Sequence, residues 1–461
     1  MDIFRKKTVG GLEETDGKLK RTLSALDLTA LGVGAIIGTG IFVLTGVAAA
    51  VHAGPALIIS FAIAALTCVL SALCYSEFAS SVPVSGSAYA YSYVAFGEII
   101  AWVLGWDLIL EYGVAAAAVA SGWSSYFTGL LDGFGIHLPA AISGAYDASR
   151  GSIVDLPAMV IIFVITYLLN RGVQETARFN GIMVIVKLVV VLLFIGVGAF
   201  YVKPDNWSPF LPFGVGGVIN GAATVFFAYI GFDAVSTAAE EVKRPQRDMP
   251  IAIIASLAIC TLLYILVSLV LTGMVPYTSL NVGDPVAFAL RFVNQNALAG
   301  LTSVGAIAGM TTVLLVMLFG LTRLLFAISR DGLITSKLSR VSGKAQTPTQ
   351  STWATGTLIA LLTGFVPLSK LANLTSIGTL FAFAVVSLGI IALRKNNPDK
   401  KGGFRVPWVP FLPLLSAAAC LYLMINLQAM TWIGFGVWMV VGLLIYFMYG
   451  RRHSLLNHDQ S

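Results

Sequence analysis

Long apolar stretches alternate with short polar segments along almost the whole chain. From Leu26 to the C-terminus, apolar stretches of about 20 residues recur with few charges inside them, and a helix needs about 20 such residues to cross the hydrocarbon layer of a membrane. This pattern predicts an all-α integral membrane protein. We expect twelve transmembrane helices, at residues 26–50, 55–80, 96–130, 156–170, 179–202, 215–240, 251–274, 298–329, 353–367, 374–393, 411–427 and 432–449.

The composition agrees with a chain that lies mostly in lipid. Of its 461 residues, 57% are hydrophobic and 11% are charged, whereas about a quarter of the residues in soluble domains are charged. The net charge of +6 does not indicate nucleic-acid binding, because Lys and Arg lie between apolar segments and not on one soluble face. The four cysteines lie singly in apolar stretches and the four histidines do not cluster, so the pattern indicates neither a metal site nor an enzyme active site.

Lys and Arg are distributed unequally between the two sides of the predicted bundle. With the N-terminal tail (residues 1–24) inside, 23 of the 28 lie on the inner side, four lie on the outer side, and Lys187 lies within a helix. Cytoplasmic loops carry the excess of positive charge in membrane proteins. We therefore expect a multi-pass protein of the plasma membrane, with its N-terminal tail and its C-terminal tail (residues 451–461) in the cytoplasm.

Two of the predicted helices carry glycines near their midpoints. The first contains Gly32, Gly34, Gly38 and Gly40 in the run LGVGAIIGTGIF, and the sixth contains Gly231 in the run YIGFD. Glycine costs a helix about 1 kcal/mol relative to alanine, and unwound backbone at membrane depth is tolerated only where it lines a cavity. The exposed amides of such a break attract a carboxylate, and its carbonyls suit an ammonium group. An amino acid zwitterion carries both groups.

The positions of these two helices in the chain indicate internal symmetry. Helices 1 and 6 are equivalent if residues 25–203 and 214–394 form two inverted five-helix repeats with a binding site between them, and residues 409–450 then form two peripheral helices. Glycines in one helix alone would more simply indicate close helix packing. Two interrupted helices at equivalent positions favour a binding site at the breaks.

Three runs carry a resemblance to a known family. Residues 32–42 (GVGAIIGTGIF), 82–93 (VPVSGSAYAYSY) and 226–250 (FFAYIGFDAVSTAAEEVKRPQRDMP) resemble the amino acid, polyamine and organocation transporter superfamily. The similarity is to bacterial homologues of its cationic amino acid transporter branch, and it extends from about Leu23 to Arg452. It implies the leucine-transporter-like fold, with two inverted five-helix repeats and two further helices.

The same resemblance implies a set of substrate-binding residues. The substrate carboxylate would meet backbone amides near Ile37, Thr39 and Gly40. The substrate ammonium would meet carbonyls near Ile36, Phe227, Ala228 and Ile230, and the Phe227 ring would cover the site from outside. Met317 would face the substrate side chain, and its bulk would favour small substrates.

Lys187 lies in the apolar run GIMVIVKLVVVLLF, with no acidic residue in its own predicted helix. A lysine near the centre of a membrane helix costs about 2.5–3.5 kcal/mol, so a functional role must be considered. From the residues alone, proton exchange and snorkelling of the side chain toward the inner interface explain Lys187 equally well. By resemblance, Lys187 matches the helix 5 lysine that proton-coupled relatives have where sodium-coupled relatives hold an ion. The coupling ion would then be H⁺, with no other cofactor.

Several acidic residues also lie within predicted helices. Asp107 and Glu111 are four residues apart and therefore share a helix face. Glu111 contributes to the substrate pocket or pairs with Lys187, or else it makes only a helix-packing hydrogen bond; the sequence leaves these alternatives open. We expect Asp107 near the outer interface and Asp233 as the cap of the second half of helix 6.

Together these observations predict a proton-coupled amino acid symporter that imports small neutral L-amino acids such as alanine. Glu111 leaves a cationic permease for arginine or lysine open as an alternative, and a proton-independent exchanger of the same fold is another. A channel is not indicated, because the sequence has no filter motif or repeated pore-lining ring. The expected partners are the amino acid and the lipid bilayer, with no nucleic acid; a small single-helix membrane partner would leave no recognisable mark in the sequence.

Overall fold

The computed structural model describes residues 5, 23–81, 87–149, 151–172, 177–233, 235, 242–340, 348–396 and 403–455. Within these ranges the regular structure is helical, apart from three isolated β-bridges. The α-helices are α2 (Ala25–Ile36), α3 (Thr45–Ala48), α4 (Leu57–Ser81), α5 (Ser87–Ala95), α6 (Glu98–Gly133), α7 (Leu156–Asn170), α8 (Ala177–Gly198), α9 (Gly214–Val225), α11 (Pro245–Met274), α12 (Pro285–Phe292), α13 (Asn296–Arg330), α14 (Thr349–Phe365), α15 (Leu368–Asn396), α16 (Phe411–Ile425), α17 (Ala429–Ile445) and α18 (Arg451–His453).

The described helices suit a membrane. Seven of them are long and apolar enough to cross a bilayer by length and composition, and four shorter ones are also apolar. Every span expected from the sequence overlaps a helix of the structure, so the all-helical membrane fold is confirmed. The count of twelve spans and their division into inverted repeats stay predictions.

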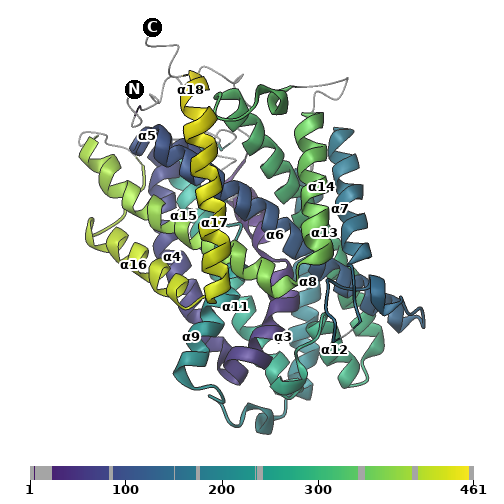
Figure 1. Cartoon of the computed structure of the whole chain (residues 1–461). Coiled ribbons are helices and arrows are strands. Elements are labelled where there is room, and N and C mark those ends of the chain that lie inside the picture. Colours follow the sequence, from purple (N-terminus) through teal and green to yellow (C-terminus); the bar gives the residue numbers. More distant parts are fainter. Residues whose placement is uncertain are drawn as a thin grey trace.

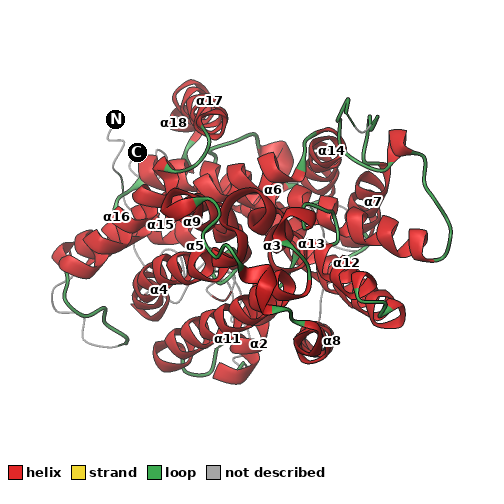
Figure 2. Ribbon diagram, turned by 90° about the horizontal axis from the view of Figure 1, so that it is seen from below, coloured by secondary structure: helices red, strands yellow, loops and turns green. Residues whose placement is uncertain are grey.

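The helices pack into one bundle, with α18, the last described helix, at one end (Figure 1). The long helix α6 packs against α13 and α15, and α11 packs against α2 and α4. Figure 2 shows α6 and α13 within the bundle, with α8 and α17 at its edges. The outward faces of α8 and α17 are apolar, as a lipid-facing surface requires: Leu192 is 55% exposed and Val437 is 59% exposed.

The first predicted helix is broken in the middle. Its inner half, α2, begins at a capping box in which the Ser24 hydroxyl accepts from the Asp27 amide and the Asp27 carboxylate accepts from the Ser24 amide. This half ends at Ile37, whose extended ψ of 102° stops the helical hydrogen bonding. A second helical stretch of mixed π and α turns then runs from Gly40 to Ala53. It ends at Gly54, which has a φ of +58°.

The sixth predicted helix is also broken. Its outer half, α9, tightens into a 3₁₀ turn at Phe226–Tyr229. Ile230 is then extended, with a ψ of 137°, and Gly231 has a φ of +110°, a conformation that favours glycine. Most of the second half of this helix lies outside the described residues. The two interruptions expected from the glycine runs are therefore confirmed.

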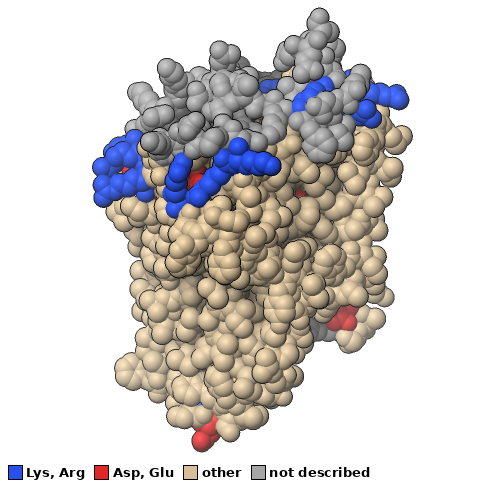
Figure 3. Space-filling view, turned by 90° about the vertical axis from the view of Figure 1, so that its left-hand side faces the viewer, with Lys and Arg blue, Asp and Glu red and all other residues tan. Residues whose placement is uncertain are grey.

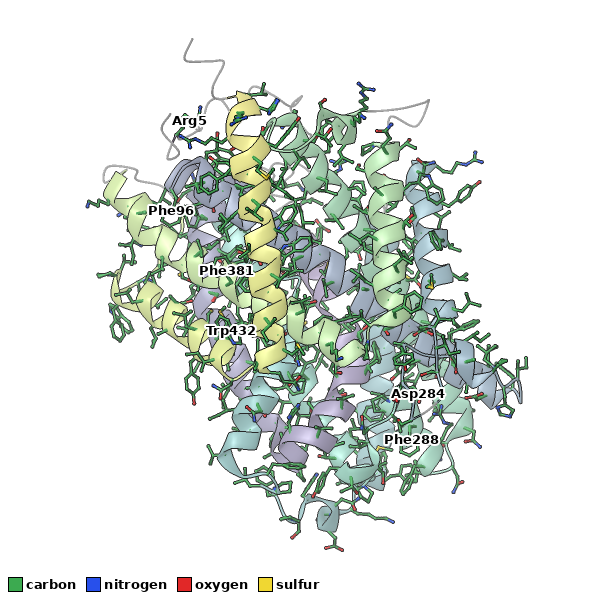
Figure 4. The ribbon with its side chains drawn as sticks, viewed as in Figure 1. Arg5, Phe96, Asp284, Phe288, Phe381 and Trp432 are labelled. Carbon is green, nitrogen blue, oxygen red and sulfur yellow. The ribbon has the colours of Figure 1, made fainter. Side chains whose placement is uncertain are left out.

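Basic side chains gather at the end of the bundle that holds Arg5 and α18. Figure 3 shows Lys and Arg in a band at this end, above a wide surface with few charges. Arg5 lies at the same end, whereas Asp284 lies toward the opposite one (Figure 4). The unequal distribution expected from the sequence is thus present in space, and it agrees with a cytoplasmic location for the end that holds Arg5 and α18.

Candidate functional site

The two helix breaks cross each other at two glycines. A Cβ atom on Gly40 would collide with the Cα atom of Ala228, so only glycine lets helix 1 approach helix 6 this closely. A Cβ atom on Gly231 would lie 2.9 Å from the carbonyl oxygen of Ala35. The breaks are therefore in direct backbone contact, and the substrate residues expected from both helices lie around one point.

Helix ends of both polarities meet at this crossing. Helix α2 and the 3₁₀ turn at Phe226–Tyr229 both end here, so both present carbonyl oxygens. The outer half of helix 1 begins here and presents amides from Thr39 and Gly40 onward. Carbonyl ends attract a cation, and an amide end attracts an anion. The arrangement can hold an ammonium and a carboxylate side by side.

All the expected substrate residues are buried. The largest exposure among them is 6%, for Phe227. The set consists of Ile36, Ile37, Thr39, Gly40, Phe227, Ala228, Ile230, Met317 and Glu111. The Thr39 side chain points toward two other helices: its hydroxyl lies 3.3 Å from Met310 Sδ of α13 and 3.5 Å from the Val119 carbonyl oxygen of α6. At the break, Thr39 therefore offers its backbone amide and not its side chain.

Lys187 is completely buried and contacts helix 1. Its Nζ donates to the Gly34 carbonyl oxygen over 2.7 Å, and its exposed fraction is 0%. The structure therefore contradicts snorkelling toward the inner interface. The Lys187 stem lies against Gly309 of α13, where an added Cβ would come within 2.9 Å of two of its carbons. Lys187 thus lies between helix 1 and α13.

The carboxyl groups of Asp107, Glu111 and Asp233 form a buried group. Each of the three residues is at most 1% exposed. Asp233 and Asp107 are the charged neighbours of Glu111, and the Thr379 side chain lies nearby. The Tyr112 hydroxyl lies 3.4 Å from Asp233 Oδ2. Among the described residues no ion pair joins Glu111 to Lys187, so that alternative is not supported.

Two expectations for these acidic residues change in the structure. Asp107 does not lie at the outer interface; it is buried against Gly378 of α15, and neither of its carboxyl oxygens has a hydrogen-bond partner among the described residues. Asp107 is nine residues from the start of the 36-residue helix α6, so it lies well inside the span. The cap expected at Asp233 concerns residues that lie mostly outside the described ranges.

Two residues at the site were missed. Tyr264 of α11 reaches both helix breaks with its hydroxyl, and Gly309 makes room for Lys187. A tyrosine inside the apolar run TLLYILV is a polar group in a membrane helix, and this signal could have marked Tyr264. Nothing in the sequence distinguishes Gly309 from the other glycines of its helix.

Comparison with known proteins decides the family. A model of the family described as amino acid permease matches residues 23–449. The chain belongs to the amino acid permease family. This match confirms membership of the superfamily that the three sequence runs resembled. The permease is therefore a membrane transporter, and it is not an enzyme.

Curated relatives match over almost their full lengths. This permease is 57% identical over 457 residues to the methylthioribose transporter of Bacillus subtilis (strain 168), and the match covers 99% of each chain. It is 54% identical over 461 residues to the branched-chain amino acid permease BcaP of the same organism, again with 99% of each chain covered. Cationic amino acid transporter 4, vacuolar, of Arabidopsis thaliana is 33% identical over 584 residues, with 99% of this chain and 96% of the relative covered.

Proposed function

We propose that this permease is a symporter that imports neutral L-amino acids together with protons across the plasma membrane. One observation carries the proposal: two broken helices cross at Gly40 and Ala228 and bring carbonyl ends and an amide end to one buried point. A zwitterion satisfies both kinds of end at once. In this proposal residues 25–203 and 214–394 form the inverted repeats, and both termini are cytoplasmic.

Protons are the proposed coupling ion because of the position of Lys187. Its ammonium group donates to the Gly34 carbonyl at the inner half of helix 1. Loss of the proton would remove the charge from this contact and weaken the attachment of helix 1 to helix 5. A change in protonation can thereby bias the movement of the inner half-helix. A proton-independent exchanger would not need a titratable group at this position.

The lining of the crossing favours neutral side chains. Ile37, Ile230 and Met317 are apolar and buried, so a charged substrate side chain would have little compensation near them. Glu111 has Asp233, Asp107 and Thr379 as neighbours and would serve a cationic substrate only by leaving this group. BcaP, a relative at 54% identity, is named for branched-chain amino acids. We therefore include valine, leucine and isoleucine with alanine as candidate substrates.

A second candidate substrate is methylthioribose. The relative at 57% identity is named as its transporter. Methylthioribose is an uncharged sugar thioether, so it has no ammonium and carboxylate to match the opposed carbonyl and amide ends. The helix breaks support an amino acid, and the sequence identity supports the sugar. The transport experiment must include both.

Transport into liposomes tests this proposal. The purified protein should accumulate labelled L-alanine or L-valine when the outside is acidified, and excess unlabelled arginine, lysine or methylthioribose should compete poorly. Lys187→Ala should lose the accumulation driven by the pH gradient. Lys203→Ala is a matched control, because Lys203 is exposed just beyond the outer end of the same predicted helix, and it should behave like the wild type.

Three results would contradict the proposal. Accumulation of methylthioribose but of no amino acid would favour the sugar transporter. Strong competition by arginine and lysine would favour the cationic permease. Normal gradient-driven accumulation by Lys187→Ala would remove Lys187 from coupling, and uptake that requires amino acid inside the liposomes would favour an exchanger.

A further inference from the structure

Tyr264 is a buried tyrosine whose side chain points at both helix breaks. It lies on α11 with an exposed fraction of 0%. Its ring packs against Phe61 of α4 and Tyr229 of the 3₁₀ turn, with both ring centroids 5.3 Å away. Aromatic contacts on two sides fix the ring. The direction of its hydroxyl is therefore fixed by packing.

The Tyr264 hydroxyl reaches a carbonyl oxygen from each broken helix. It lies 2.7 Å from the Ala228 oxygen and 3.0 Å from the Ile36 oxygen. A hydroxyl has one proton, so it donates to one of these carbonyls at a time. The other carbonyl then lacks this donor, which is costly for a buried carbonyl. The site thus has two acceptors for one proton.

We propose that Tyr264 is a positioning residue for the substrate's ammonium group, an inference that rests on the proposed amino acid transport. Its hydroxyl holds the Ile36 and Ala228 carbonyls close together, so both can accept from one ammonium. The ammonium brings three N–H donors and supplies the one that the hydroxyl lacks. Tyr264 also ties the break of helix 1 to that of helix 6 through one atom, without itself carrying charge.

Replacing the hydroxyl by hydrogen removes this tie and leaves the ring in place. In Tyr264→Phe the two carbonyls lose their shared donor and are free to separate, so an ammonium would reach one of them less well. Binding of the substrate should weaken, while the proton-coupling group at Lys187 is untouched. We expect KM for L-alanine and L-valine to rise by about 10-fold, the factor for one hydrogen bond. We expect kcat to change by less than about 2-fold, since binding is what the hydroxyl assists.

A neighbouring tyrosine gives a matched control. The Tyr229 hydroxyl is equally buried and donates to the Phe61 carbonyl over 3.1 Å, away from the crossing. Tyr229→Phe loses the same chemical group from the same aromatic cluster and should keep the wild-type KM. A second measurement isolates the ammonium: propionate lacks the amine of alanine, so its inhibition constant should be equal in wild type and Tyr264→Phe. If Tyr264→Phe does not fold, replacement of Tyr264 by 4-aminophenylalanine, which keeps an N–H donor at the same ring position, should fold with a KM near that of the wild type.

The outcomes separate this inference from the proposed function. A wild-type protein that transports amino acids, with an unchanged KM in Tyr264→Phe, would overturn the positioning role alone. The role would also be overturned if Tyr229→Phe raised KM as much, if propionate inhibition weakened in step with alanine transport, or if the 4-aminophenylalanine variant folded with a KM well above that of the wild type. A wild-type protein that transports no amino acid would overturn the proposed function and the inference with it.

Discussion

Two glycines shape the surroundings of Lys187, one beside its stem and one where its helix meets helix 1. Its ammonium reaches Gly34 on helix 1, and its stem lies against Gly309 on α13. The Asn180 and Val184 side chains of the same helix also lie against Gly34, where an added Cβ would come within 3.0 Å and 2.7 Å of them. Gly309 thus makes room for the lysine stem, and Gly34 lets helix 1 approach the helix that carries the lysine.

This arrangement predicts the effect of one added methyl group. In Gly309→Ala the new Cβ would come within 2.9 Å of Lys187 Cγ and Cε, so the stem must shift and the ammonium must leave Gly34. We expect gradient-driven uptake to fall about 10-fold or more, on the basis that an ammonium–carbonyl hydrogen bond is worth ~1.5–3 kcal/mol. Gly300→Ala is the control, since nothing lies within 4 Å of a Cβ there. Equal uptake by both variants would contradict the account of Lys187.

The buried carboxyl group of Asp155, in the loop before α7, should make the stability of the protein depend on pH. Burial raises its pKa from 3.8 to about 6, although the Ser124 hydroxyl and the Ala158 amide act in the opposite direction. The folded protein therefore binds the proton more tightly than the unfolded chain does. The stabilisation is complete below about pH 4 and is lost as pH rises through about 6.

Asp155→Asn tests this dependence. The amide oxygen can still accept from Ser124 and Ala158, and it has no charge to desolvate. The melting temperature of the variant should exceed that of the wild type at pH 7, and the difference should shrink as pH falls from about 6 to about 4. Asp205→Asn, at an exposed position of the outer loops, should show no such trend. A pH-independent difference for Asp155→Asn would contradict the assignment.

At the residue scale, the sequence was informative where a residue is unusual for its surroundings. Lys187 could be found because a charge in an apolar run is costly. The cluster of carboxyl groups around Glu111 could not be predicted from the sequence, because Asp233 comes from a helix far away in the chain. Tyr264 was missed because aromatic residues are common in membrane helices, and only the fold shows that its hydroxyl reaches two carbonyls.

At the scale of elements, a buried network joins both tails of the chain to the start of α6. Glu98 has an exposed fraction of 0%. Its carboxylate pairs with Arg5 over 3.2 Å and accepts hydrogen bonds from the hydroxyls of Tyr446 and Ser454. The Arg5 carbonyl also accepts from the Glu98 amide. One carboxylate therefore holds the N-terminal tail, the C-terminal tail and α6 together.

Removal of this carboxylate should destabilise the protein. Glu98→Ala would leave the buried Arg5 charge without this partner, and breaking a buried ion pair costs about 3–5 kcal/mol. We expect a clear fall in the melting temperature of the purified protein. Asp132→Ala provides the comparison: Asp132 is near the other end of α6 and its pair with His137 is exposed, so its loss should cost less than about 1 kcal/mol. Equal effects of the two variants would argue against the network.

The positions of most helices could be predicted from the lengths of the apolar stretches, whereas the tight turns and the contacts of the two tails could not. The breaks in helices 1 and 6 were predictable because glycine runs weaken a helix locally. The last helix, expected to be peripheral, is attached to α6 by a reciprocal pair: the indoles of Trp106 and Trp438 each donate to the other's carbonyl oxygen. Such a pair depends on how two helices meet, which periodicity does not specify.

For the whole molecule, the unequal distribution of Lys and Arg predicts its orientation. The four native cysteines are buried, so a new exposed cysteine should react selectively. Ser149→Cys lies in a loop on the predicted outer side, and Ser336→Cys lies on the predicted inner side. A membrane-impermeant maleimide added to intact cells should label position 149 and leave 336 unlabelled until the cells are broken. The reverse pattern would invert the topology and place the termini outside.

The all-helical membrane class and the amino acid permease family followed from composition, apolar length and three sequence runs. The contacts at the crossing did not, because they depend on how closely two backbones approach. Gly40 and Ala228 are far apart in the sequence, and only the packed structure shows that a Cβ atom on one would collide with the other.

The central claim is that the crossing of two broken helices recognises both charges of a zwitterion. The most direct measurement is the thermal stabilisation of the purified protein by a matched series: L-alanine, alaninamide without the carboxylate, propionate without the ammonium, and methylthioribose without either. A ligand stabilises in proportion to ln(1 + [L]/Kd). The account predicts marked stabilisation by L-alanine and little by the other three. Stabilisation by alaninamide, propionate or methylthioribose equal to that by L-alanine would contradict it.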